Sequence, residues 1–197
     1  SVETILHACL PHKFVDHTHA DAVLAISNAP EGERRMREVY GDAVVIIPYV
    51  MPGFDLASLC AKEYPRQAGA NTIGMVLMHH GIFSFGDSAR QSYERMIALV
   101  GRAEDYLKRE RAWEIAVHGL RPAHIDMLQQ AQLRRKLSAA AAAPLILATH
   151  ADDETLAFAQ RADIGTLSQQ GPVTPDHIIR TKRLPLLGTD VDAYARD

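Results

Sequence analysis

The sequence predicts an α/β fold, a sandwich in which helices cover a sheet, over residues 1–110. Strand-like and helix-like segments alternate along this stretch, and such alternation favours helices packed on a sheet. The run AVVIIPYV at residues 43–50 is rich in β-branched side chains, which is typical of a buried strand. Residues 87–117 instead show the spacing of a long amphipathic helix.

Before the AVVIIPYV run, apolar spacing predicts a helix, a strand and two further helices, at residues 2–10, 13–19, 20–29 and 30–42. The first helix should stop near Pro11, because proline cannot continue a helix. Gly41 should close the last of the four, as glycine often does at helix ends.

After that run, a helix is predicted to begin near Phe54 and to break at Pro65. Residues 71–87 predict two strands joined near Gly81. Asp87 or Ser88 could cap the long helix that follows. Its apolar stripe is predicted to include four residues, Tyr93, Ile97, Val100 and Leu107.

The length of 197 residues predicts a single domain, large enough to bury a substantial core. Within it, residues 1–110 form the α/β core, residues 111–170 are helix-rich, with an alanine run at 139–143, and the proline-punctuated residues 171–197 form an extended closing segment. No G-x-G-x-x-G or G-x-x-x-x-G-K-[ST] motif occurs in the chain.

Composition excludes several classes of protein. The chain is 47% hydrophobic and 23% charged, with a formal net charge of −3, so it lacks the basic surface of nucleic-acid binders. No apolar run approaches the roughly 18 residues that span a membrane, and no signal peptide opens the chain. Cys9 and Cys60 form no C-x-x-C motif, so neither a disulfide framework nor a cysteine zinc site is expected. A reducing, cytoplasmic location follows.

Histidines at the ends of two predicted strands suggest a metal site. His17 and His19 are two residues apart, so on a strand they project to the same face. His79 and His80 end the next apolar strand, and His80 is the better candidate, because Gly81 should let the backbone bend beside it. Three histidines with one open position are typical of catalytic zinc. The alternative for the H-x-H pair is a solvated edge.

Acidic residues near these histidines could assist them. Glu3 starts the helix that leads into the first histidine strand, and it could be a general base or simply complement the helix dipole. His7, on the same helix face, could hold that carboxylate or merely pack. Asp16 and Asp21 could orient the ligand histidines or be cap and solvent residues.

Two motifs in the later part of the chain contain possible ligand or binding residues, but a structural role is favoured for each. In THADDE, Asp152 and Asp153 are predicted to be helix-start acids rather than metal ligands. In TPDHIIRTK, a structural or solvated role is favoured over binding of an anionic substrate, and the residues concerned are His177, Arg180 and Lys182.

Four segments together resemble the class II aldolase/adducin family: SVET with the following histidine, HTHADAV, MPGFDLA and HHGIFSFGDSARQSYERM. The resemblance implies a three-layer α/β/α sandwich with a central, mostly antiparallel sheet. It implies Glu3 as acid/base and His17, His19 and His80 as ligands of Zn2+ or another divalent metal. It also implies a homotetramer with a small-molecule sugar phosphate as substrate.

More narrowly, LPHKFVDHTHADA, GDSARQSYE and GPVTPDHIIRTKRLPL resemble the aldolase half of bifunctional rhamnulose-1-phosphate aldolase/short-chain dehydrogenase proteins. This implies retro-aldol cleavage of a ketose 1-phosphate such as L-rhamnulose 1-phosphate. The family's phosphate-binding loops precede the glutamate, so the chain is expected to lack part of the N-terminal region. Alternatives on the same scaffold are a sugar-phosphate epimerase or decarboxylase, or a non-catalytic adducin-like binding module.

Overall fold

The structure is a computed structural model that describes residues 2–115, 119–121 and 126–196, without the side chains of Val2, Glu3, Pro175 and Arg180. Contacts group the chain into two compact units. Residues 1–113 and 173–180 form unit 1, and residues 114–172 and 181–197 form unit 2. The prediction of a single domain stays a prediction.

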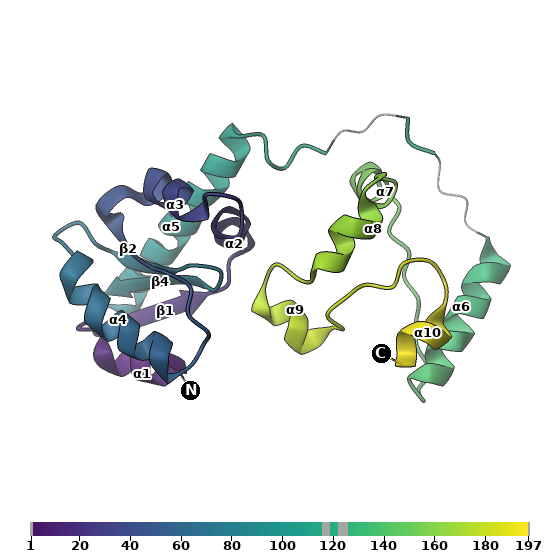
Figure 1. The fold of residues 1–197 in the computed structure, drawn as a ribbon, viewed down its shortest axis with the longest axis horizontal. Coiled ribbons are helices and arrows are strands. Elements are labelled where there is room, and N and C mark those ends of the chain that lie inside the picture. Colours follow the sequence, from purple (N-terminus) through teal and green to yellow (C-terminus); the bar gives the residue numbers. More distant parts are fainter. Residues whose placement is uncertain (1, 116–118, 122–125, 197) are drawn as a thin grey trace. The chain divides into compact units, whose positions relative to one another are not determined.

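Unit 1 is built on a four-stranded sheet with the order β1-β4-β3-β2 (Figure 1). Its strands are β1 (Phe14–Thr18), β2 (Val44–Ile47), β3 (Gly74–Leu77) and β4 (Gly81–Gly86). β4 pairs antiparallel with both β1 and β3, whereas β2 pairs parallel with β3. The sheet is therefore mixed but mostly antiparallel, as the family resemblance implies.

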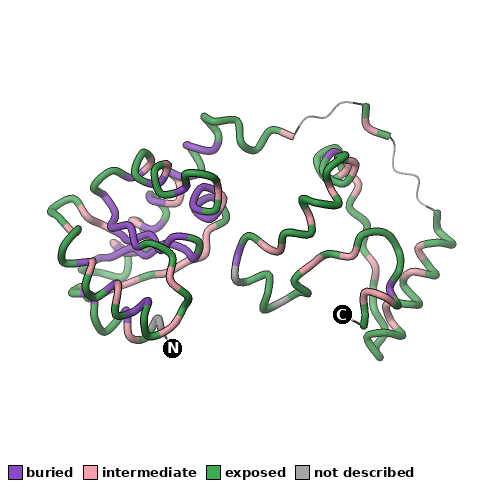
Figure 2. Tube along the Cα trace, viewed as in Figure 1, coloured by how far each residue is buried: buried purple, intermediate pink, exposed green. Residues whose placement is uncertain are grey.

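Helices cover both faces of this sheet, so the predicted three-layer sandwich is confirmed (Figure 1). One face packs against α2 (Asp21–Ser27), α3 (Gly32–Tyr40) and α5 (Ala89–Arg109). The other packs against α1 (Val2–Cys9) and α4 (Phe54–Gln67). Side chains alternate between the two faces, and β2, β3 and β4 are buried throughout, whereas β1 is half-buried (Figure 2).

The long helix α5 begins as predicted, because the Ser88 side chain accepts a hydrogen bond from the Gln91 backbone N–H. The predicted apolar stripe is partly wrong: Tyr93 is 62% exposed and Ile97 is 56% exposed. The buried face is turned by about one residue, since the Ser84 hydroxyl donates to the Ser92 carbonyl at 2.8 Å and draws Ser92 against β4. The buried row is Ser92, Met96, Leu99, Ala103, Tyr106 and Leu107.

The predicted break at Pro65 is also wrong, because α4 continues through it to Gln67. Pro65 lies in the last turn, where it removes only one hydrogen-bond donor from a helix that is about to end. The buried Tyr64 side chain holds this turn against the core, and its carbonyl accepts from the Ala68 N–H at 2.8 Å.

The remaining helices follow α5 in sequence. They are α6 (Met127–Ala140), α7 (Asp153–Ala159), α8 (Ile164–Leu167), α9 (Pro175–Arg180) and α10 (Val191–Arg196). Asp152 caps α7 by accepting from the Thr155 N–H at 2.9 Å, which confirms its predicted place at a helix start. The segment predicted to be extended, 171–197, instead contains α9 and α10. Among the described residues, no helix has the length and apolar character needed to cross a bilayer.

The two cysteines should differ sharply in reactivity. Cys60 is 0% exposed, and burial raises the pKa of its thiol to about 12, whereas Cys9 is exposed. Because the thiolate is the reactive form, a thiol-specific reagent at pH 8 should label one cysteine of the folded protein quickly. The second should react only after denaturant is added. Two equivalents of rapid labelling in the folded protein would contradict this.

Candidate metal centre

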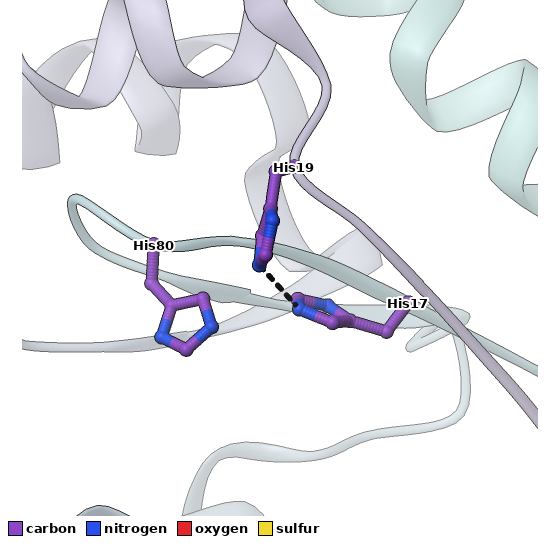
Figure 3. Close-up of side chains that lie close together, drawn as sticks. All are labelled: His17, His19 and His80. Carbon is purple, nitrogen blue, oxygen red and sulfur yellow. Dashed lines mark hydrogen bonds between the residues drawn. The ribbon is translucent and has the colours of Figure 1, made fainter. Parts of the chain in front are cut away.

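The antiparallel pairing of β1 with β4 brings together the three histidines that the sequence singles out (Figure 3). Thr18 at the end of β1 lies opposite Ile82 near the start of β4. His17 is in β1, His19 follows that strand directly, and His80 immediately precedes β4. Residues distant in sequence therefore meet at one end of the sheet.

The distances between the three rings suit a single ion. One ring nitrogen from each of His17, His19 and His80 can be chosen so that all three lie within 4.8 Å of one another. The Nε2 atoms of His17 and His19 are 3.0 Å apart. Tetrahedral zinc with Zn–N bonds of about 2.0–2.1 Å needs ligand nitrogens roughly 3.3 Å apart, so small ring rotations would complete such a site.

Hydrogen bonds at the other ring nitrogens orient two of the histidines. His17 Nδ1 lies 3.0 Å from the Ile82 carbonyl oxygen, and His19 Nδ1 lies 2.8 Å from Asp176 Oδ2. Both oxygens accept, so both Nδ1 atoms donate and both Nε2 atoms keep lone pairs. Two lone pairs that face each other at 3.0 Å need a cation between them, either a proton or a metal ion.

Burial favours the metal ion over the proton at His17. Its ring stacks on Phe83, with centroids 4.1 Å apart and an interplanar angle of 17°. Burial lowers the pKa of His17 to about 4; the Ile82 carbonyl opposes the shift, and the nearby His19 and His80 rings add to it. His17 is therefore neutral near pH 7, and neutral imidazole is the form that binds metals.

Gly81 leaves room for two of these rings. A Cβ atom on Gly81 would lie 2.9 Å from His17 Cε1, 3.0 Å from His19 Cδ2 and 2.6 Å from the Thr18 carbonyl oxygen. The sequence-based explanation of this glycine was wrong: the left-handed residue of the turn is His79, with φ of 60°. Gly81 is needed for the close approach of β1, not for the bend.

The other predicted site residues lie in several places. Glu3 is part of α1, but its side chain lies outside the described residues. His7 is exposed, with its ring centroid 6.4 Å from that of Phe83. His79 is exposed and hydrogen-bonds Asn28 Oδ1 through Nδ1 at 2.7 Å, which separates it from the three-histidine cluster.

Sequence reasoning missed Asp176. It considered Asp16 and Asp21 either as residues that orient the ligand histidines or as cap and solvent residues. Both are exposed, and the orienting hydrogen bonds come from Ile82 and Asp176. The motif TPDHIIRTK drew attention to His177 instead, which bonds Thr174 at 2.5 Å. No local signal could identify Asp176, because it is 157 residues from its partner His19.

Family comparison agrees with this fold. Residues 1–107 match the model of the class II aldolase and adducin N-terminal domain, and residues 125–196 match the class II aldolase second domain. The first match alone covers more than half of the chain. The chain therefore belongs to the class II aldolase and adducin family.

Individual relatives extend the comparison. The protein named uncharacterized oxidoreductase YuxG, from Bacillus subtilis (strain 168), is 34% identical in an alignment of 194 residues that covers 94% of this chain. The chain spans only 28% of the length of that relative.

Two solved structures are also similar over part of the chain. The N-terminal class II aldolase domain of a conserved Thermoplasma acidophilum protein is 44% identical, with a TM-score of 0.47, over 54% of this chain and 48% of that one. A sugar-phosphate aldolase from Thermotoga maritima is 17% identical, with a TM-score of 0.45, over 56% of this chain and 53% of that one.

Replacing Gly81 should distort the histidine cluster. In Gly81→Ala, the new methyl group would collide with the Thr18 carbonyl oxygen and with the His17 and His19 rings, so the end of β1 and both rings would have to shift. We expect the affinity for Zn2+, measured by competition with a chromophoric chelator, to fall by about tenfold or more, as when other supports of metal ligands are lost.

Gly101→Ala provides the matched control. Gly101 lies in α5, and a Cβ atom there would meet nothing within 4 Å. This variant should bind Zn2+ like the unmodified protein. Equal affinity in both variants would show that the space at Gly81 does not matter for the site.

The stability of the metal-free protein should depend on the protonation of His17. Folded His17 takes up a proton only as the pH falls toward its pKa of about 4, whereas the ordinary value is 6.5. Between these values the unfolded state binds more protons, so the free energy of unfolding should decrease as the pH falls from 6.5 to about 4. Denaturant titrations should show a smaller decrease in His17→Gln. If the free energy of unfolding decreased equally in His17→Gln and in the unmodified protein, His17 would not be the source of the pH dependence.

Proposed function

We propose that this chain carries the metal centre of a class II aldolase that cleaves a ketose 1-phosphate, such as L-rhamnulose 1-phosphate, to dihydroxyacetone phosphate and an aldehyde. Zn2+ is the proposed metal, with His17, His19 and His80 as its ligands. The observation that carries the proposal is the convergence of three histidine ring nitrogens within 4.8 Å of one another, with the Nε2 atoms of His17 and His19 at 3.0 Å. The ring of His80 lies beside that pair.

The donor set fits the chemistry of this reaction. Cleavage of a carbon–carbon bond next to a carbonyl leaves negative charge on the carbonyl fragment. A bound divalent ion would act as a Lewis acid that stabilises this charge. Three neutral imidazoles leave the ion's charge undiminished, and a three-ligand set keeps a position open for substrate oxygen.

Glu3 is the proposed acid/base that moves a proton to and from the reacting carbon. It precedes His7 by one turn of α1. The rings of His7 and His17 both lie against Phe83, which connects α1 to the sheet face where the histidines gather. A carboxylate can serve as a general base when its surroundings bring its pKa toward neutrality.

The rest of the proposal concerns the setting of the reaction. The proposed partner is a small-molecule sugar phosphate, and the proposed assembly is a cytoplasmic homotetramer. The two free cysteines fit a reducing compartment. Presence of all three histidines favours an enzyme over a non-catalytic adducin-like module, since a binding module has no need of them. Identification of the products would separate cleavage from epimerisation or decarboxylation.

Glu3→Gln should separate metal binding from turnover. The amide keeps the size of the side chain but cannot carry the proton, so the rate should fall by about 10²–10⁴-fold while the zinc content stays unchanged. Production of dihydroxyacetone phosphate from L-rhamnulose 1-phosphate, followed with a coupled reductase, measures the rate. Elemental analysis of the same sample measures the zinc.

His80→Ala provides the comparison, because it removes a proposed ligand and should lose both zinc and turnover. His79→Ala, which changes the neighbouring exposed histidine, should retain both. Turnover at the unmodified rate in Glu3→Gln, or full zinc content in His80→Ala, would remove that residue from the proposed site.

A further inference from the structure

A short helix from late in the chain contacts the candidate metal centre. Helix α9 belongs to unit 1 with the rest of the segment 173–180, although the residues on both sides of this segment belong to unit 2. Its Asp176 Oδ2 accepts a hydrogen bond from His19 Nδ1 at 2.8 Å. Asn28 Nδ2 donates to the Val173 carbonyl at 3.2 Å and provides a second attachment.

We propose that Asp176 is a positioning residue of the metal centre. Its carboxylate holds the His19 ring in the tautomer and orientation that present Nε2 to the ion, and metal binding in turn fastens α9 to the site. This inference rests on the metal centre of the proposed function. It concerns a residue that contacts a ligand rather than the ion or the substrate.

His19 needs such support more than His17 does. The acceptor for His17 is the backbone carbonyl of Ile82, which the pairing of β1 with β4 puts in place. His19 lies one residue beyond the end of β1, where no strand hydrogen bonds fix the backbone. Among the described residues, the hydrogen-bond partner of its Nδ1 is Asp176, so the orientation of this ring depends on a side chain of α9.

The hydrogen bond should strengthen when a metal binds. A cation at Nε2 withdraws electrons from the ring and makes the Nδ1–H a better donor to the carboxylate. Without the metal, the pair is open to water, because the side chains of His19 and Asp176 are 18% and 55% exposed. Water screening weakens such a contact. The attachment of α9 should therefore be loose in the metal-free protein and firm in the metal-bound one.

Linkage makes the two effects equal. If Asp176 strengthens metal binding by a given factor, metal binding must strengthen the docking of α9 by the same factor. The proposal thus predicts two observables, one at the ion and one in the backbone of the segment 173–180. A carboxylate with only a structural role would affect neither the metal affinity nor the metal dependence of that segment.

The first test measures the affinity for Zn2+ in the whole chain by competition with a chromophoric chelator. Asp176→Asn keeps the shape of the side chain and removes its charge, and we expect Zn2+ to bind about 10- to 100-fold more weakly. Asp176→Glu should recover part of that loss. The spectrum of bound Co2+ should also change in Asp176→Asn, because the His19 ring is no longer held in the same orientation.

Asp21→Asn is the matched control. Asp21 lies two residues from His19 and is exposed, so its replacement removes the same charge close to the site without removing the hydrogen bond to His19. Its Zn2+ affinity should match that of the unmodified protein. If both variants bound Zn2+ equally weakly, the effect of Asp176 would come from its negative charge alone and not from its hydrogen bond to His19. That result would overturn the proposal.

The second test starts from the unmodified protein and compares it with Asp176→Asn. Hydrogen exchange of the unmodified protein should show slower exchange across residues 173–180 when Zn2+ is added, and this slowing should be lost in Asp176→Asn. The proposal would be overturned if Asp176→Asn bound Zn2+ as tightly as the unmodified protein does. It would also be overturned if the exchange rates of residues 173–180 did not change when Zn2+ is added. Neither result would contradict the metal centre itself. Absence of Zn2+ binding in the unmodified protein would overturn the proposed function and this inference together.

Discussion

The site depends on the register between β1 and β4. Because Thr18 lies opposite Ile82, the end of one strand meets the start of the other, and histidines from both converge there. A slip of one residue would turn His17 to the opposite face of the sheet, away from Phe83 and from the other two rings. Such a slip would also turn the half-buried Val15 away from the core cluster against which it packs.

The same pairing explains the electrostatic character of the cluster. His17 can donate Nδ1–H to the Ile82 carbonyl only because β4 runs alongside it, and this donation leaves its second nitrogen as an acceptor. Stacking on Phe83 then removes water from the ring and disfavours its protonated form. Geometry and desolvation both prepare a neutral nitrogen ligand, and Gly81 allows the backbone to come close enough for the rings to meet.

Much of this arrangement could be predicted from the sequence, since its determinants are local. β-Branched runs marked the strands, and the i, i+2 spacing of His17 and His19 indicated a shared face. His12 lies apart from these residues in the packing, where it stacks on Phe85 at 4.4 Å and bonds the Tyr64 hydroxyl at 2.6 Å.

Other features could not be predicted, because tertiary contacts decide them. The buried face of α5 follows from the contact of Ser92 with Ser84, and α4 passes Pro65 because the Tyr64 side chain is held in the core. Neither contact leaves a periodic signal in the sequence. Asp176 is the extreme case, since a single carboxylate on a six-residue helix carries no pattern that points to a histidine 157 positions earlier.

That separation has a consequence for how the protein matures on the ribosome. All three imidazoles emerge before the carboxylate that orients His19, because Asp176 follows that histidine by 157 residues. A nascent chain would thus meet the cellular metal pool with its imidazoles present and one of them still free to rotate. Tight capture of the ion would then be delayed until α9 has been synthesised.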